Sequence, residues 1–140
     1  MTRPILVGAV AYDPKVVVIL IGINSIDRQT ADVAAGVKAV VNFFRTKTPD
    51  AKLLLLGIFP KGEKADDPLR ARIQAVNQLL IRFADGSRVT YLDVGKRLLT
   101  EDGTLTKAIA PDGGHLSSLG YQMWADAILA TVTSLLGGYR

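Results

Sequence analysis

The sequence contains no cysteine and only one histidine among its 140 residues. The absence of cysteine excludes a disulfide scaffold, a thiolate zinc site and a cysteine nucleophile. A single histidine excludes a metal site built from several imidazoles, which leaves only carboxylate ligands for an ion. We therefore expect neither a bound metal nor a cofactor.

Long apolar runs and clusters of positive charge are also scarce. The longest apolar run, Val16 to Ile23, is too short to cross a bilayer. Lysine and arginine number 17 against 13 acidic residues, but they are scattered along the chain. We therefore expect no membrane span and no nucleic-acid surface. The N-terminal residues show no signal-peptide cleavage pattern, so the expected location is the cytoplasm.

The length and a hydrophobic content of 49% predict one globular domain, 1–140. Apolar, β-branched runs alternate with segments that repeat apolar residues at helical spacing. This alternation predicts an α/β fold with a parallel sheet, flavodoxin-like or Rossmann-like. The predicted strands are Val16–Ile21, Leu53–Ile58 and Val89–Leu92. The predicted helices run from Thr30 or Asp32 to Phe44, from Pro68 to Phe83, and from a Ser117 or Ser118 cap to a Gly137-Gly138 stop.

Ligands of such folds bind beyond the carboxyl ends of the strands, so the residues after each strand are candidate site residues. The segments Gly22–Ser25 and Phe59–Gly62 follow the first two strands, and Asp93 follows the third. Another candidate is the glycine-rich loop 111–117, which precedes the last helix. No G-x-G-x-x-G or Walker-type loop follows any strand, which disfavours a nucleotide binder.

Asp112 and His115 form a D-x-x-H unit on this glycine-rich loop. At this spacing the carboxylate can bond to Nδ1 of the imidazole and leave Nε2 free to act as a base. The alternative is that His115 only caps the last helix or fills a surface niche.

Asn24 follows a buried strand and a glycine, where its amide can donate a hydrogen bond to a developing oxyanion. The alternative interpretation is a turn residue or a cap for the next helix. The combination with Asp112 and His115 favours the oxyanion role.

Several ordered motifs resemble the SGNH, or GDSL-type, esterases and lipases, and within them the platelet-activating-factor acetylhydrolase catalytic-subunit-like branch. The resemblance is carried by residues 14–24, which look like the G-x-N block, by 57–64, 68–70 and 76–80, and by the D-x-x-H-L-S block 112–117 with Gly120-Tyr121. It implies a three-layer α/β/α fold of SGNH type and hydrolysis of a small acyl ester. It also implies that His115 is the general base, Asp112 its orienting carboxylate and Asn24 an oxyanion donor.

The family's serine nucleophile lies in a G-D-S block that precedes the G-x-N block, and here no serine precedes Ser25. The chain therefore resembles a family member truncated by its first two strand-helix units. Ser25 is a possible surrogate nucleophile, although its loop lacks the sharp turn that exposes an activated hydroxyl. Ser117 and Ser118 are better placed as helix caps. Water activated by His115 is a further option.

Without those units the strand from Val16 becomes a sheet edge. Residues 5–13 resemble the end of the helix that leads into this strand in the family. The alternative is that residues 5–11 fold back as an additional strand. A homo-oligomer joined through the edge is the expected alternative to such a strand. Two functions remain: a weakly active or inactive acyl-ester hydrolase domain, or a non-catalytic oligomeric binding module derived from one.

Overall fold

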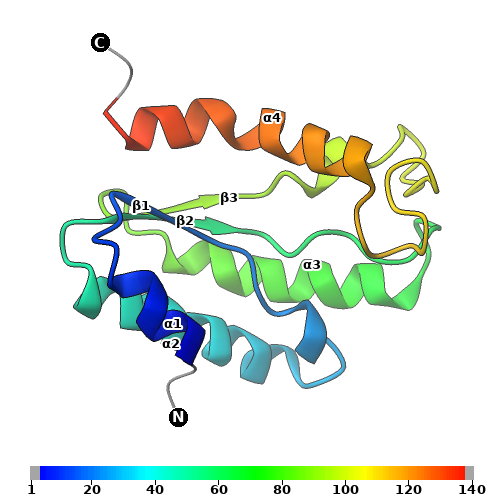
Figure 1. Ribbon diagram of the computed structural model, residues 1–140. Helices are drawn as coiled ribbons and strands as arrows, with labels where there is room; N and C mark the ends of the chain where they lie inside the picture. The colour runs from blue at the N-terminus through cyan, green and yellow to red at the C-terminus, as the bar shows by residue number, and fades with distance from the viewer. Residues whose placement is uncertain (1–3, 138–140) are drawn as a thin grey trace.

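The computed structural model describes residues 4–137 and contains a three-stranded parallel sheet with helices on both faces (Figure 1). The strands are β1 (Val16–Ile19), β2 (Lys52–Leu56) and β3 (Val89–Leu92), in the order β1-β2-β3. The register pairs Val17 with Leu53, and Leu53 with Val89. The predicted α/β class and parallel sheet are confirmed.

The first two strands end earlier than the sequence predicts. β1 ends at Ile19 instead of Ile21, and β2 ends at Leu56 instead of Ile58. After β1, Gly22 adopts a φ of 118°, a left-handed conformation that suits glycine, and leads into the short turn η1 (Ile23–Ser25). After β2, Ile58 forms hydrogen bonds with a side chain of a neighbouring helix instead of extending the ladder.

Three helices cover one face of the sheet and one helix lies on the other (Figure 1). The first three are α1 (Pro4–Val10), α2 (Thr30–Lys47) and α3 (Pro68–Leu80), and α4 (Ser118–Leu135) lies opposite. The short turns η2 (Ile81–Phe83) and η3 (Gly95–Leu98) flank β3. The predicted second helix thus ends at Leu80, and η2 accounts for its last predicted turn.

The three longer helices begin where the sequence predicts. Asp67 caps α3 by accepting a hydrogen bond from the Leu69 N–H at 2.9 Å, and Ser117 caps α4 by accepting one from the Gly120 N–H at 3.2 Å. α2 begins at Thr30, one of its two predicted starts. Its capping position is Gln29, which makes no side-chain cap hydrogen bond. Gly137 follows α4 with a φ of 91°, and Gly138 lies outside the described residues.

The alternative in which residues 5–11 form a strand was wrong, because this segment is the helix α1. Leu6 and Val10 are one helical turn apart and pack together against the main core. Burying this pair stabilises the helix, and it leaves β1 with β2 as its one strand partner within residues 4–137. β1 is therefore an edge of the described sheet.

The core is concentrated between the sheet and the helices α2 and α3. The four residues Leu53–Leu56 of the central strand are fully buried, with Leu53 and Leu55 in this core. On the opposite face the cluster is small: Leu98, Leu105 and Ala110, with partly buried neighbours. Gly120 is the one buried residue of α4. Among residues 4–137, no helix is both long enough and apolar enough to cross a membrane.

Candidate functional site at the carboxyl ends of the strands

The loops that follow β1 and β2 meet the loop before α4 around a cavity of about 240 Å³. Its wall is mostly apolar, and His115 and Lys61 are the basic side chains that line it. The lining residues are Leu20, Ile21, Ile23, Ile58, Phe59, Pro60, Lys61, Gly114, His115, Leu116, Tyr121 and Trp124. The histidine loop and the Asn24 loop therefore lie on the same rim of the sheet, as the sequence predicts.

The loop before α4 brings Asp112 and His115 together. Asp112 Oδ2 lies 2.6 Å from His115 Nδ1. Asp112 Oδ1 accepts hydrogen bonds from the backbone N–H groups of Gly114 at 2.9 Å and His115 at 2.7 Å. Gly113 adopts a φ of 77°, which the tight turn requires. The pairing is therefore encoded within four consecutive residues.

The electrostatics of this pair follow from the same hydrogen bonds. The pKa of the Asp112 carboxyl is held well below its usual range by hydrogen bonds to the ionised form. The largest contribution comes from the backbone N–H of His115, followed by its imidazole and by the Gly114 N–H. The carboxylate is thus ionised at neutral pH and can accept a hydrogen bond from His115 Nδ1. The imidazole is 91% exposed, and Nε2 makes no hydrogen bond within residues 4–137. Asp112 can therefore orient the imidazole of His115 so that Nε2 is free to accept a proton from a water molecule or a hydroxyl group.

The structure places Asn24 and Ser25 in η1, next to Ile23, which lines the cavity. Asn24 is exposed and does not cap α2, whose capping position is Gln29. Neither Asn24 nor Ser25 belongs to the lining of the cavity, and no hydrogen bond joins Ser25 to His115 among the described residues. The geometry therefore leaves the Asn24 amide available at the rim without bringing Ser25 into contact with the histidine.

The other polar candidates have structural partners. The Ser117 hydroxyl donates to the Ala108 carbonyl and accepts from Gly120, which agrees with the predicted capping role. Asp93 accepts a hydrogen bond from the Gly95 N–H at 2.9 Å. Burial, and secondarily the charge of Asp93, raises the pKa of Tyr91 to about 12. The Asp93 bond stabilises the turn after β3.

Sequence reasoning missed the positioning role of Asn77 on α3. Its side chain is buried, accepts from the Ile58 N–H at 2.8 Å and donates to the Ile58 carbonyl at 3.0 Å. These bonds anchor the segment that carries Phe59, Pro60 and Lys61 to the cavity. A signal was present, because Asn77 shares the apolar stripe of α3 with Ile73 and Leu80.

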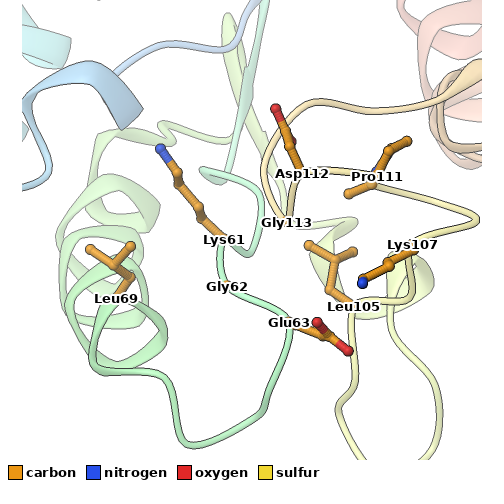
Figure 2. A pocket seen from close by; sticks show the side chains of 10 residues that line it. Lys61, Gly62, Glu63, Leu69, Leu105, Lys107, Pro111, Asp112 and Gly113 are labelled. Atoms are coloured by element: carbon orange, nitrogen blue, oxygen red, sulfur yellow. The ribbon is translucent and has the colours of Figure 1, made fainter.

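A second cavity, of about 310 Å³, is lined by residues of the Asp112 loop and of the segment after β2 (Figure 2). Its lining residues are Lys61, Gly62, Glu63, Leu69, Leu105, Lys107, Ala110, Pro111, Asp112 and Gly113. The Gly62 N–H donates to the Gly113 carbonyl at 2.8 Å and holds the two loops together. Lys61 lines both cavities, whereas Asp112 lines only the second cavity and His115 only the first.

The parallel sheet with helices on both faces defines a three-layer α/β fold, with the cavity at the carboxyl ends of the strands. A carbohydrate esterase family 3 structure from Talaromyces cellulolyticus has the same fold, with a TM-score of 0.75 and 22% identity, covering 96% of this chain and 65% of that one. The GDSL-like lipase/acylhydrolase family matches residues 2–123. The chain belongs to this family.

Within the family, the chain is related to platelet-activating factor acetylhydrolase IB subunits. It is 36% identical over 109 residues to subunit alpha2 from Rattus norvegicus, covering 77% of this chain and 47% of that protein. It is 32% identical over 124 residues to subunit alpha1 from Homo sapiens, covering 88% of this chain and 53% of that protein. The chain thus spans about half the length of the curated relatives it matches.

Proposed function

We propose that the chain is an acyl-ester hydrolase domain in which His115 is the general base, Asp112 orients it and Asn24 donates to the oxyanion. The observation that carries this proposal is the 2.6 Å contact between Asp112 and His115 beside an apolar cavity. A small acyl ester is the substrate class that such a site accommodates, and the reaction needs no cofactor.

We further propose that the chain alone is weakly active or inactive, because these 140 residues contain no G-D-S block and no serine before Ser25. The usual nucleophile of the family is thereby missing from them. Hydrolysis then proceeds by water that His115 activates, or through Ser25 as a surrogate. Water is favoured, since Ser25 has no hydrogen bond to His115 among the described residues.

The test is hydrolysis of p-nitrophenyl acetate by the purified chain and its variants His115→Ala, Ser25→Ala and Ser118→Ala. Oxyanion binding and orientation without a complete triad leave roughly 10³- to 10⁴-fold acceleration over water, so we expect slow but measurable turnover. His115→Ala should lower this activity, because the general base is lost, whereas Ser25→Ala should leave it unchanged, like the control Ser118→Ala. Free imidazole at the same concentration sets the background.

Two results contradict this mechanism. Fast turnover with an acyl group attached to Ser25 shows that Ser25 is the nucleophile. A rate for the unaltered chain that matches both His115→Ala and free imidazole shows that the pair does not catalyse hydrolysis, and it favours the non-catalytic alternative.

That alternative, a homo-oligomeric binding module, is supported by the edge strand β1. The strand carries no charged residue that would discourage pairing with another strand. The Lys52 N–H donates to the Lys15 carbonyl, so Val17 and Ile19 direct their backbone groups towards β2. Val16 and Val18 therefore direct theirs to the open edge. The apolar residues Val18 and Ile21, in and just after β1, are 40% and 39% exposed.

We propose that a second copy of the chain pairs with this edge about a two-fold axis, so that two sheets become one. An uncharged strand paired antiparallel with itself is self-complementary, as a two-fold interface requires. Exposed apolar side chains of α4, Tyr121 at 56% and Leu129 at 63%, add apolar surface on one face. Sedimentation equilibrium should give a mass of twice 15.0 kDa.

Val18→Lys places a charge on the open edge and should give the monomer, whereas Val7→Lys, at an exposed position of α1, should leave the dimer intact. A 15.0 kDa monomer for the unaltered chain at micromolar concentration refutes the pairing.

A further inference from the structure

The cavity beside His115 combines an apolar wall with basic groups and has no acidic residue in its lining. Phe59 and Trp124 meet edge to face in this wall, with ring centroids 5.4 Å apart. The Asp112 carboxylate does not line this cavity; it contacts the imidazole and accepts hydrogen bonds from two backbone N–H groups. A ligand in this cavity therefore meets apolar side chains and positive charge.

The stem of Lys61 lies against the loop that carries His115. A Cβ atom built at Gly114 would lie only 3.2 Å from Lys61 Cε and 3.5 Å from Cδ, so the stem lies flat against the loop that carries His115. The adjacent Gly62 is fixed by its bond to Gly113 and by Arg70, whose Nη2 donates to the Gly62 carbonyl at 2.9 Å. The lysine is therefore preorganised, which lowers the entropic cost of binding a ligand.

The ammonium group of Lys61 has no carboxylate partner within residues 4–137. In Figure 2 its side chain points away from Glu63 and Lys107, which line the other cavity. The residue is half-buried. A half-buried cation without a counter-ion, at the edge of an apolar cavity, is suited to bind an anion attached to an apolar chain.

We propose that this cavity binds a short-chain carboxylate, with its carboxylate group on the Lys61 ammonium and its alkyl chain against Phe59 and Trp124. A volume of about 240 Å³ is below that of a typical drug-sized site, which favours a small amphiphile over a large ligand. The inference rests on the proposed function, because carboxylates are the acid products of ester hydrolysis. It assigns to Lys61 the holding of that product.

Binding can be measured without any ester, because Trp124 is the only tryptophan of the chain and lines the cavity. Its fluorescence is followed during titration with hexanoate and, separately, with the neutral isostere hexanamide. We expect a saturable change with hexanoate and about tenfold weaker binding of hexanamide, the size expected for one partly solvated charge-assisted bond. The difference should shrink at high ionic strength.

Variants assign the effect to Lys61. Lys61→Met keeps the length of the side chain without its charge and should bind both ligands equally weakly, whereas Lys61→Arg should retain the preference for hexanoate. Lys96→Met, at an exposed position of η3, is the matched control and should behave as the unaltered chain. Circular dichroism checks that the variants are folded.

The proposal is overturned if hexanamide binds as tightly as hexanoate, if Lys61→Met keeps the preference, or if hexanoate does not bind. Inorganic phosphate is the remaining probe. A saturable response to phosphate equal to that of hexanoate would mean that the site binds anions without using the alkyl chain, and it would also overturn the proposal. Because the probes are not esters, these results do not depend on whether the chain hydrolyses p-nitrophenyl acetate. Failure of the proposal and failure of the catalytic function are therefore distinguishable.

Discussion

Replacing Asn77 by alanine tests whether a buried amide on α3 holds the cavity segment after β2. The Asn77 side chain satisfies both backbone groups of Ile58, which is 2% exposed. Asn77→Ala leaves this donor and this acceptor unpaired, and each buried unsatisfied group costs about 1 to 3 kcal/mol. Water that enters the space left by the amide offsets part of this cost. We expect the free energy of unfolding to fall by about 3 kcal/mol.

Urea unfolding followed by Trp124 fluorescence measures this change. The midpoint should fall while the slope stays constant, because the surface exposed on unfolding is nearly the same. In a thermal scan the same loss corresponds to a decrease of about 10 °C for a chain of this length. Gln78→Ala, at the exposed neighbouring position of α3, is the control and should change stability by less than about 0.5 kcal/mol.

A second variant separates the hydrogen bonds from the loss of volume. Asn77→Leu fills the space but provides neither bond, so it should be destabilised almost as much as Asn77→Ala. If Asn77→Ala is as stable as Gln78→Ala, the two bonds to Ile58 do not anchor the segment and the reasoning is refuted. If Asn77→Leu is as stable as the unaltered chain, packing and not hydrogen bonding explains the effect.

Three further predictions concern α4, Tyr91 and Asp112. A Cβ at Gly120 would lie 2.6 Å from the Ile109 carbonyl oxygen, so Gly120→Ala should lower the free energy of unfolding by about 2 kcal/mol. The control Gly36→Ala lies in open space on α2 and should not destabilise the protein. Because its pKa is raised to about 12, Tyr91 should be the last of the tyrosines to lose its proton in an absorbance titration. Its contribution to stability should disappear as the pH rises from the ordinary tyrosine pKa towards this value. A dependence of stability on pH that is the same in Tyr91→Phe contradicts this. The pKa of Asp112 is lowered, so its contribution to stability is present above the ordinary carboxyl pKa and is lost as the pH falls through the folded value. In a ¹³C NMR titration His115→Ala should raise this pKa only in part, because the backbone N–H groups remain. A full return of the pKa to the ordinary carboxyl value contradicts the assignment.

Features that depend on neighbouring residues could be predicted from the sequence. The apolar runs place the three strands, and the Pro68 and Ser117 signals place the starts of α3 and α4. The contact between Asp112 and His115 belongs to the same group, because four consecutive residues with a glycine at positive φ generate it. The catalytic roles of Asp112, His115 and Asn24 stay predictions until the variants are measured.

The boundaries of elements were less predictable, because competition between partners decides them. An apolar residue such as Ile58 suits a strand by type, yet it leaves the ladder because Asn77 offers both hydrogen bonds. Residues 5–11 suit a strand or a helix equally by composition. Packing of Leu6 and Val10 against the core selects the helix.

The sequence by itself determined the α/β class, the order of the elements and the locally encoded Asp112–His115 turn, because these depend on residue type and on short spacings. Only the tertiary structure decided that Asn77 supports Ile58, that Lys61 lies against Gly114, and that β1 is an edge of the described sheet. Such contacts join residues that are distant along the chain, and the packing of the sheet against its helices brings them together. The cavity beside His115 is therefore a product of the fold, although the histidine itself was visible in the sequence.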